Sequence, residues 1–335
     1  MTDWVQQAQH LTDEVLRPAS TEVDGSGMIP QSHFETLRDQ GFYGLAFASK
    51  DPVTTLADVG EILVSGCLAT AFVWAQHHGT LLRLMMSRND ALKAQFLADL
   101  RSGAITAGVS GSGYANPDNP LVVATETDDG YTITGRAPFV TGWGYVDVIG
   151  VTAYDTRADK TVTFLIDATD GPNIYSKRIP LSAADASNTV QLTFSEFEVP
   201  HTSVIRAGKP SRGGLGVADR AVLRINGSLA LGVARACLTE AARIGHPSSQ
   251  LWETHTTIRE ALSNPASGDG DIYDARARAS QFAVTAANYV ATAAGSPSVQ
   301  RGEPTERMVR EAAFSMVCTT TPEIKSRILT TCHPH

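Results

Sequence analysis

Hydrophobic residues in the first hundred positions recur with the period of an α-helix. Residues 4–11 place their apolar side chains on one helical face, and the stretch 56–86 is apolar on nearly all sides. The second pattern predicts a buried helix or a pair of buried helices. Asn89 is a suitable N-cap for the next helix, and Gly103 is expected to end it.

The pattern changes at Ala104 to the two-residue alternation of β-strands. Six segments rich in β-branched residues are predicted to be strands: 105–110, 121–127, 131–135, 146–154, 161–166 and 190–199. The sequence Asp128-Asp129-Gly130 separates two of them, and Gly130 can adopt the positive φ of a tight hairpin turn. Those two strands are therefore expected to be antiparallel neighbours. Pro200 is expected to end the last strand.

The helical period returns after the glycine-rich bend at 213–216. Residues 246–271 contain several prolines and glycines and are expected to be a loop around one short helix. Helices are predicted at 217–244, 273–294 and 305–317. The expected fold class is α+β, with an N-terminal helical domain at 1–103, a middle antiparallel β-domain at 104–205 and a shortened C-terminal helical domain at 206–335.

The amino-acid composition is typical of a globular protein and not of a membrane protein. The chain has 335 residues, of which 42% are hydrophobic and 19% charged, as in ordinary globular proteins. No apolar run reaches the roughly 18 to 20 residues that cross a membrane, and residues 1–17 lack the basic start and apolar core of a secretory signal. We therefore expect a soluble cytoplasmic protein with no membrane partner.

The net charge argues against a nucleic-acid-binding protein, and the cysteine spacing argues against a protein stabilised by disulfides or zinc. The net charge of −8 is unfavourable for a nucleic-acid partner, which selects clustered Lys and Arg. The four cysteines form neither a CxxC pair nor a dense pattern, so they are expected to be reduced thiols: Cys67, Cys237, Cys318 and Cys332. No metal site is predicted.

Three local motifs resemble one known family. Residues 134–147 (TGRAPFVTGWGYVD) resemble a strand and loop of the acyl-CoA dehydrogenases in which "NG", "K", "W-I-T" and "A-D" recur. Residues 192–200 (LTFSEFEVP), preceded by the sequence SNT at 187–189, resemble that family's "L-x-F-E-x-V-x-V-P" strand and its "S-D-T". Residues 304–312 (PTERMVREA) resemble its "P-V-E-R-x-x-R-D-A" helix. By this resemblance the chain is identified as a member of the acyl-CoA dehydrogenase superfamily.

The resemblance implies a cofactor, a substrate class and an assembly. It implies FAD held between the sheet domain and the C-terminal helices, in a dimer or tetramer of this chain or of this chain with a homologous subunit. It also implies a fatty or steroid-like acyl thioester, on coenzyme A or acyl carrier protein, and an electron-transfer acceptor. In such a reaction a base takes the α-proton while a hydride leaves the β-carbon for the flavin.

Cofactor contacts are carried over position by position. Ser110, after Val109, falls at the Thr of "T-E-P", and Asn116 falls at the serine of "G-S-D". Phe139 and Thr141 fall at the "W" and "T" of "W-I-T", and Thr321 falls at the Thr of "E-G-T". The resemblance thus assigns flavin contacts to Val109, Ser110, Asn116, Phe139, Thr141 and Thr321. Taken alone, Ser110 and Thr141 would be ordinary strand residues and Phe139 a core residue.

The positions of the substrate contacts and of the catalytic base match the family pattern less closely than those of the cofactor contacts. The resemblance assigns Ser187 and Asn188, in the counterpart of "S-D-T", and Arg224 to the acyl site. Thr319 takes the position of the usual catalytic Glu, and a neutral Thr cannot abstract the proton. Some family members carry the Glu just before the counterpart of Arg224, where this chain has Leu223, or Val222 if the register slips by one residue.

His77 and His78 are the other candidates for a base. They lie on a helix that borders the acyl pocket in the family, so one of them would be a substitute base. The alternative is that one histidine is buried and hydrogen-bonded while the other is exposed.

Two cofactor elements of the family are reduced in this chain. The "R-x-x-F-G" element is absent, because residues 252–271 are shortened and glycine-rich, and the "Q-x-x-G-G-x-G" turn is reduced to residues 294–298. In the family these elements hold the pyrophosphate and adenosine of FAD across a dimer interface. FAD binding by a homodimer of this chain is therefore expected to be weak.

Three hypotheses remain open. The preferred one is a base-less partner in a mixed assembly, similar to the short subunits of bacterial steroid side-chain acyl-CoA dehydrogenases, which would place the chain in lipid metabolism and steroid degradation. The second is a solitary FAD-dependent dehydrogenase with a relocated base. The third keeps the fold but changes the reaction to an elimination such as desulfination, or to flavin-dependent hydroxylation.

Overall fold

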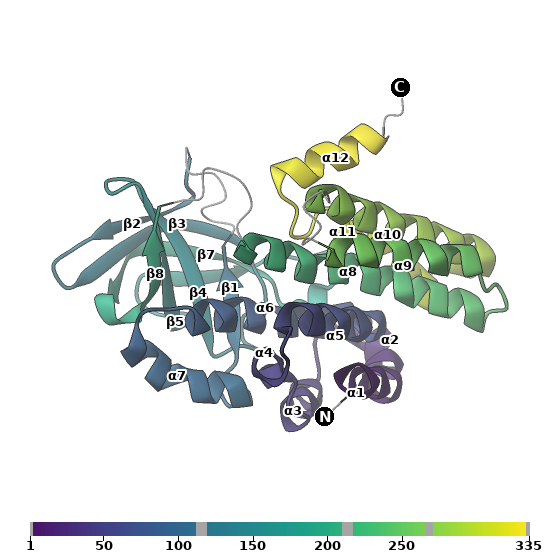
Figure 1. Ribbon diagram of the computed structural model, residues 1–335, viewed down its shortest axis with the longest axis horizontal. Helices are drawn as coiled ribbons and strands as arrows, with labels where there is room; N and C mark the ends of the chain where they lie inside the picture. The colour runs from purple at the N-terminus through teal and green to yellow at the C-terminus, as the bar shows by residue number, and fades with distance from the viewer. Residues whose placement is uncertain (1–2, 112–118, 210–216, 265–270, 333–335) are drawn as a thin grey trace.

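One eight-stranded sheet lies at one end of the molecule, and helices from both ends of the chain stack beside it (Figure 1). The computed structural model describes residues 3–111, 119–209, 217–264 and 271–332. The order of elements in these residues is helices, strands, helices. The α+β class is confirmed, whereas the domain boundaries after residues 103 and 205 stay predictions.

The N-terminal helices follow the predicted pattern. They are α1 (Trp4–Leu11), a π-helical turn (Thr12–Leu16), α2 (Arg17–Ser26), α3 (Gln31–Asp39), a 3₁₀ turn (Phe42–Gly44), α4 (Leu45–Ala48), α5 (Pro52–Gly66), α6 (Leu68–Met85) and α7 (Asp90–Ser102). The apolar stretch is a pair of helices, α5 and α6. The Asn89 side chain accepts a hydrogen bond from the Leu92 N–H at 3.0 Å, so it is the predicted N-cap. Gly103 ends α7 in the left-handed conformation, at φ 76°.

The sheet contains the six predicted strands and two more. Its strands are β1 (Ala107–Ser110), β2 (Val122–Glu126), β3 (Gly130–Val140), β4 (Val148–Asp155), β5 (Lys160–Asp167), β6 (Ile174–Arg178), β7 (Val190–Pro200) and β8 (Val204–Gly208). The order is β6-β7-β3-β2-β4-β5-β8, with β1 paired to β4 beside this path. β2 and β3 pair as antiparallel neighbours, as predicted. Gly130 begins β3 and does not have a positive φ, so the role predicted for it in the turn is wrong. Sequence alternation missed β6 and β8, which are only five residues long.

The prediction of a purely antiparallel sheet needs one correction. β1 pairs with β4 in parallel along its whole length, and β2 meets β4 in parallel at Val123 and Tyr154. A parallel neighbour needs a connection of about a dozen residues or more. The chain between Ser110 and Val148 is long enough, because it contains β2 and β3.

The C-terminal helices depart more from the expectation. They are α8 (Val217–Arg243), α9 (Ser249–Ser263), α10 (Ile272–Ala294), a 3₁₀ turn (Ser296–Val299), α11 (Pro304–Ser315) and α12 (Pro322–Cys332). α9 occupies most of the segment expected to be a loop. α11 ends two residues earlier than predicted, and α12 was not predicted.

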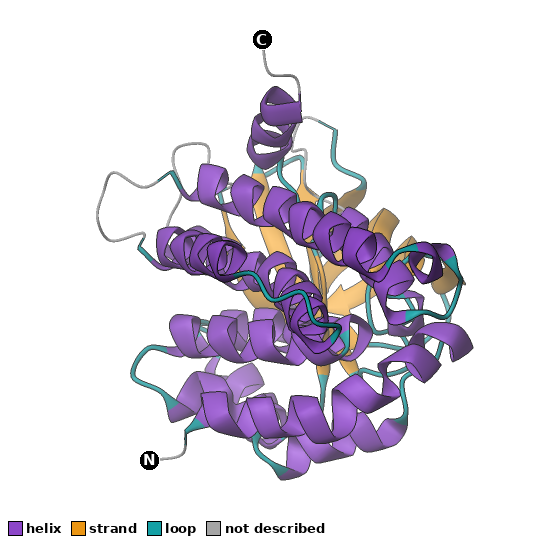
Figure 2. Cartoon of the chain, turned by 90° about the vertical axis from the view of Figure 1, so that its right-hand side faces the viewer, coloured by secondary structure: helices purple, strands orange, loops and turns teal. Residues whose placement is uncertain are grey.

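The N-terminal and C-terminal helices are joined where α5 lies against α8, and the strands lie behind this helical stack in the second view (Figure 2). A Cβ at Gly232 would lie 2.5 Å from the Val64 Cβ and 2.7 Å from the Glu61 carbonyl oxygen. Only glycine therefore permits this close approach of α8 to α5.

A second, smaller core joins the helices to the sheet. It lies between α6, α7 and strands β1, β4, β5 and β8, and its largest buried members are Leu81, Leu84, Leu92, Leu100, Val148, Leu165 and Ile205. This core fixes α6 against the sheet, which places His77 of α6 beside β1.

One segment among the described residues, Arg220–Arg243 of α8, is long and apolar enough to cross a membrane. However, 72% of its most apolar window is buried inside the protein. Such burial is what the core helix of a globular protein shows.

Candidate functional site

A bulge at the end of β3 positions two of the predicted flavin contacts. The pairing of β3 with β7 is interrupted between Ala137 and Val140, and Phe139 within the bulge has a φ of 56°. Its side chain is 61% exposed, whereas Thr141, two residues later, is buried. A positive φ is unusual for an aromatic residue, and Phe139 is not the core residue that its type alone would suggest.

Thr141 belongs to a chain of buried hydroxyl groups. The Thr141 and Thr189 hydroxyls are hydrogen-bonded at 3.1 Å, and the Thr189 and Ser187 hydroxyls at 3.0 Å. The Asn188 side chain donates to the Trp143 carbonyl oxygen at 2.6 Å. The structure thus brings together Thr141 with Ser187 and Asn188, although sequence separates them by more than forty residues.

β1 carries the next pair of predicted contacts beside this chain of hydroxyls. A Cβ at Gly108 would lie 3.5 Å from the Thr141 carbonyl oxygen, so β1 passes directly by the end of β3. The Ser110 side chain is buried, and its hydroxyl has no hydrogen-bond partner among the described residues. Val109 is half-buried. Asn116 lies outside the described residues.

His77 and His78 lie side by side in the interior on α6. Both side chains are 1% exposed, so the expectation that one of them is exposed is wrong. The Ala107 N–H donates to His77 Nδ1 at 3.1 Å, which ties α6 to the start of β1. Burial lowers the pKa of His77 to about 3 and that of His78 well below its ordinary value.

Thr319, which the family resemblance predicts at the position of the catalytic Glu, lies in the turn between α11 and α12. Thr319 has a φ of 56°, and its hydroxyl accepts a hydrogen bond from Arg276 Nη2 at 3.2 Å. The same Arg276 nitrogen donates to the Cys318 carbonyl oxygen at 3.2 Å. The Thr321 hydroxyl accepts from the Ile324 N–H at 3.4 Å and so caps α12. Thr319 and Thr321 are thereby fixed to the C-terminal helices.

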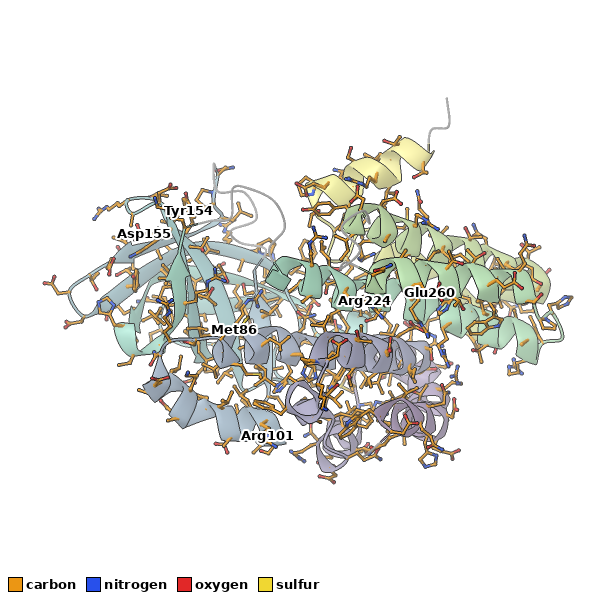
Figure 3. All side chains as sticks on the ribbon, viewed as in Figure 1. Met86, Arg101, Tyr154, Asp155, Arg224 and Glu260 are labelled. Carbon is orange, nitrogen blue, oxygen red and sulfur yellow. The ribbon has the colours of Figure 1, made fainter. Side chains whose placement is uncertain are left out.

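Arg224 is held in an ion pair between helices. On α8, it donates from Nη2 to Asp58 Oδ1 of α5 at 3.0 Å and from Nε to the Ser263 hydroxyl of α9 at 2.9 Å (Figure 3). Its side chain is only 2% exposed, and Nη1 has no hydrogen-bond partner among the described residues. The role in substrate binding assigned to Arg224 stays a prediction.

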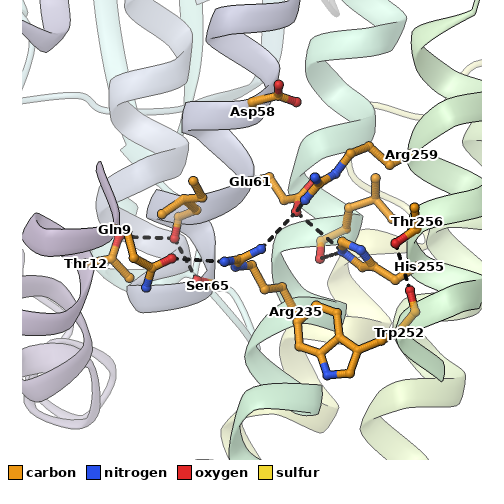
Figure 4. A network of polar contacts seen from close by, with 12 residues as sticks. Gln9, Thr12, Asp58, Glu61, Ser65, Arg235, Trp252, His255, Thr256 and Arg259 are labelled. Atoms are coloured by element: carbon orange, nitrogen blue, oxygen red, sulfur yellow. Dashed lines mark hydrogen bonds and ion pairs between the residues drawn. The ribbon is translucent and has the colours of Figure 1, made fainter. Parts of the chain in front are cut away.

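Sequence reasoning missed a buried charge network centred on Glu61 (Figure 4). Glu61 is completely buried on α5, and Arg259 of α9 donates from Nε to its Oε2 at 2.9 Å. Arg235 Nη1 and His255 Nε2 lie 3.8 Å and 3.5 Å from Glu61 Oε1. The available signal was the presence of two carboxylates, Asp58 and Glu61, inside the apolar stretch 56–86, because a buried carboxylate requires a partner.

No family model matches the chain. A benzylmalonyl-CoA dehydrogenase of Aromatoleum aromaticum is 27% identical over 255 residues, which cover 72% of this chain and 66% of that protein. The chain thus aligns with just under two thirds of that relative's length. The alignment with this relative covers most of the present chain.

Solved structures share the fold. The butyryl-CoA dehydrogenase of Megasphaera elsdenii matches with a TM-score of 0.80 at 20% identity, over 99% of this chain and 98% of that chain. PigA, solved with FAD and proline, matches with a TM-score of 0.80 at 17% identity, over 98% of this chain and 96% of that chain. The predicted acyl-CoA dehydrogenase-like fold is therefore confirmed. The chain thus has the fold of the acyl-CoA dehydrogenases and is similar in sequence to benzylmalonyl-CoA dehydrogenase.

Proposed function

We propose that the chain is a subunit of an FAD-dependent acyl-CoA dehydrogenase, in which a partner subunit supplies the catalytic base. The enzyme would desaturate an acyl thioester between its α- and β-carbons. The observation that carries the proposal is the neutral hydroxyl of Thr319, held by Arg276, at the position of the usual Glu. Leu223, at the alternative position, is a buried apolar side chain. Neither residue can take up a proton at neutral pH.

Other ionisable groups in the interior are poor substitutes for that base. The Glu61 carboxylate is bound to Arg259 at the junction of α5 and α9, and its lone pairs are engaged there. His77 has a pKa of about 3 because of burial, so it would not retain an abstracted proton at neutral pH. The pKa of His78 is also lowered by burial.

FAD is the proposed cofactor, and the residues at the end of β3 fit its flavin ring. The buried Ser110 hydroxyl at the end of β1 lacks a partner among the described residues, and Phe139 presents an exposed aromatic ring near the end of β3. Ser110 would donate to a polar edge of the ring, and Phe139 would cover one of its faces. When bound, FAD supplies the oxidant that accepts the hydride.

For the adenosine half of FAD, the described residues show no equivalent site at the position of the family's glycine-rich turn. In place of a glycine-rich turn, residues Ser296–Val299 form a 3₁₀ turn whose Ser298 hydroxyl donates to the Ala291 carbonyl oxygen at 2.8 Å. The Ser298 hydroxyl therefore uses its hydrogen within the turn and cannot donate it to FAD. We propose that a homologous partner subunit holds the adenosine, in a dimer or tetramer.

A thioester of coenzyme A is the proposed substrate, because the sequence relative is a benzylmalonyl-CoA dehydrogenase. An acyl-carrier-protein thioester, a fatty or steroid-like acyl group, a separate electron-transfer acceptor and a cytoplasmic location stay predictions. A second candidate is a solitary enzyme with another base or another reaction. It is favoured by the structural match to PigA, which was solved with proline, together with the neutral Thr319.

Co-purification from the native source tests the proposal. The proposed complex should be yellow and should contain this chain and a homologous subunit in a fixed ratio. The chain expressed alone with excess FAD should retain less than one FAD per chain. A yellow homomer with one tightly held FAD per chain would instead support the solitary enzyme.

A further inference from the structure

A small cavity lies between α5, α6 and α8. Its volume is about 10 Å³, roughly the space for one water molecule. Most of its wall is apolar, and the lining residues are Leu56, Gly60, Val64, Ala71, Trp74, Ala75, His78, Ile225, Ser228 and Leu229. A cavity of this size can hold one small group, such as a water molecule or a single oxygen atom of a larger ligand.

His78 is the polar group of this cavity without a hydrogen bond. Its side chain is 1% exposed, and neither Nδ1 nor Nε2 has a hydrogen-bond partner among the described residues. The nearby Phe42 carbonyl oxygen accepts the Trp74 indole N–H at 3.2 Å. The Ser228 hydroxyl, also in the wall, donates to the Ile225 carbonyl oxygen. A buried polar group without a hydrogen-bond partner is unfavourable, so a hydrogen-bonding occupant would be favoured.

The charge state of His78 restricts the occupant. Burial and the neighbouring His77 lower the pKa of His78 well below its ordinary value, so the ring is neutral at pH 7. A neutral imidazole offers one donor and one acceptor. It suits a hydroxyl or carbonyl oxygen, whereas a carboxylate would lose its hydration without gaining a cation.

α6 connects this cavity to the proposed flavin site. The Thr80 hydroxyl donates to the Gly108 carbonyl oxygen at 2.6 Å, and His77 accepts from the Ala107 N–H. Both bonds hold β1, which ends at Ser110. The same helix therefore presents one histidine to the strand of the flavin site and the next one to the cavity.

We propose that the cavity binds an uncharged oxygen of the acyl substrate, a hydroxyl or carbonyl group, through a hydrogen bond to His78. This inference rests on the proposed function, because it names a feature of that enzyme's substrate. The substrate would then be an oxygenated acyl thioester, whose polar group His78 distinguishes from a methylene and from a carboxylate.

The test uses the assembled, FAD-loaded protein and a panel of coenzyme A thioesters. The probes are saturated straight acyl chains of four to twelve carbons, and the same chains with a terminal hydroxyl or a terminal carboxylate. Dissociation constants are measured for the native protein and three variants. His78→Phe removes the hydrogen-bonding group, and Gly60→Ala fills the cavity, because its Cβ would lie 3.1 Å from the Ser228 hydroxyl and 3.5 Å from Trp74. Gly25→Ala is the matched helical control, since its Cβ would meet nothing within 4 Å.

At one chain length, the hydroxylated thioester should bind about three- to ten-fold more tightly than the other two, the range expected of one net hydrogen bond. The preference should disappear in His78→Phe and in Gly60→Ala and persist in Gly25→Ala. Equal binding of all three probe types, or a preference that survives in His78→Phe, would overturn the inference while leaving the proposed function standing. If no thioester binds, both the proposed function and the inference fail.

Discussion

Arg276 donates a hydrogen bond to the hydroxyl of Thr319, 43 residues away along the chain. The Arg276 side chain is completely buried, and none of its hydrogen bonds within the described residues goes to a carboxylate. Burial lowers the pKa of Arg276 to about 10, so the guanidinium is charged at neutral pH. A buried cation without an anion is unfavourable. A carboxylate at position 319 would give Arg276 the ion pair that it lacks.

Thr319→Glu should therefore stabilise the fold. A hydrogen bond to a charged group typically contributes about 1.5–3 kcal/mol. The positive φ of residue 319 offsets part of this gain, because that conformation is strained for Glu as it is for Thr. We expect the free energy of unfolding to rise by about 1 kcal/mol in urea denaturation. The control is Thr320→Glu, one residue further on. An equal change in both variants would mean that Arg276 does not recognise the new carboxylate.

Thr319→Ala should leave the turnover of the assembled enzyme within about three-fold of the native rate, because a neutral hydroxyl is not a general base. A true base contributes about 10²- to 10⁴-fold. The measurement is acyl-CoA oxidation with an artificial electron acceptor, with Thr320→Ala as control. A loss of two or more orders of magnitude, with flavin content intact, would mean that Thr319 is catalytic.

Thr141→Val should weaken FAD binding by the assembled complex about three- to ten-fold. The change removes one hydroxyl from the chain that includes Thr189 and Ser187, and one hydrogen bond contributes about 0.5–1.5 kcal/mol net. Thr152→Val is the matched control, because Thr152 also forms a buried bond to a threonine, Thr163, at 3.0 Å. Equal FAD affinities of the two variants would contradict the assignment of Thr141 to the flavin site.

Glu61→Gln should destabilise the protein by about 3–5 kcal/mol, since it leaves the charge of Arg259 without its partner. Glu260→Gln, at the neighbouring exposed position on α9, should change stability by less than about 0.5 kcal/mol. Urea denaturation of both variants measures the difference. A small effect of Glu61→Gln would mean that water reaches the network in solution.

Stability should fall as the pH is lowered from 7.5 to 5.5. Burial lowers the pKa of His77 to about 3 and also lowers those of His78 and His255, while unfolded histidines titrate near 6.5. Below pH 6.5 the unfolded chain therefore binds protons that the folded chain excludes. Each histidine contributes a slope of up to about 1.4 kcal/mol per pH unit.

The pH prediction is checked by urea denaturation across that range. His78→Phe should reduce the slope, whereas replacement of the exposed His246 by Gln should not. An unchanged slope in His78→Phe would show that His78 does not stay neutral in the folded protein.

Local signals predicted much of the fold. The Asn89 cap, the Gly103 stop and the antiparallel pairing of β2 with β3 each depend on residues close in sequence, and the structure confirms all three, although Gly130 lacks the expected positive φ. β6 and β8 were missed because each contains a single buried residue and therefore shows no apolar alternation. α12 was missed because its apolar face consists mainly of Ile324 and Ile328.

The candidate site was predictable only in part. The family resemblance pointed to Thr141, Ser187 and Asn188, and the structure does bring them together. The partners of Glu61 and of Thr319 could not be read from the sequence. Arg259 is 198 residues from Glu61, so their pairing depends on how the helices pack and leaves no periodic trace in the chain. The burial of His78 depends on the same packing of α5, α6 and α8.

The close approach of α5 and α8 has a consequence for the time course of synthesis. α5 ends at Gly66, and α8, which covers it, begins only at Val217. At roughly 5–20 residues per second, the ribosome needs on the order of ten seconds to make the intervening chain. During this interval the face of α5 that packs against α8 has no cover, and Glu61 has not yet met Arg259. α5 is therefore fully covered only after the last third of the chain has emerged. Until then, the N-terminal helices expose an apolar surface of the kind that chaperones bind.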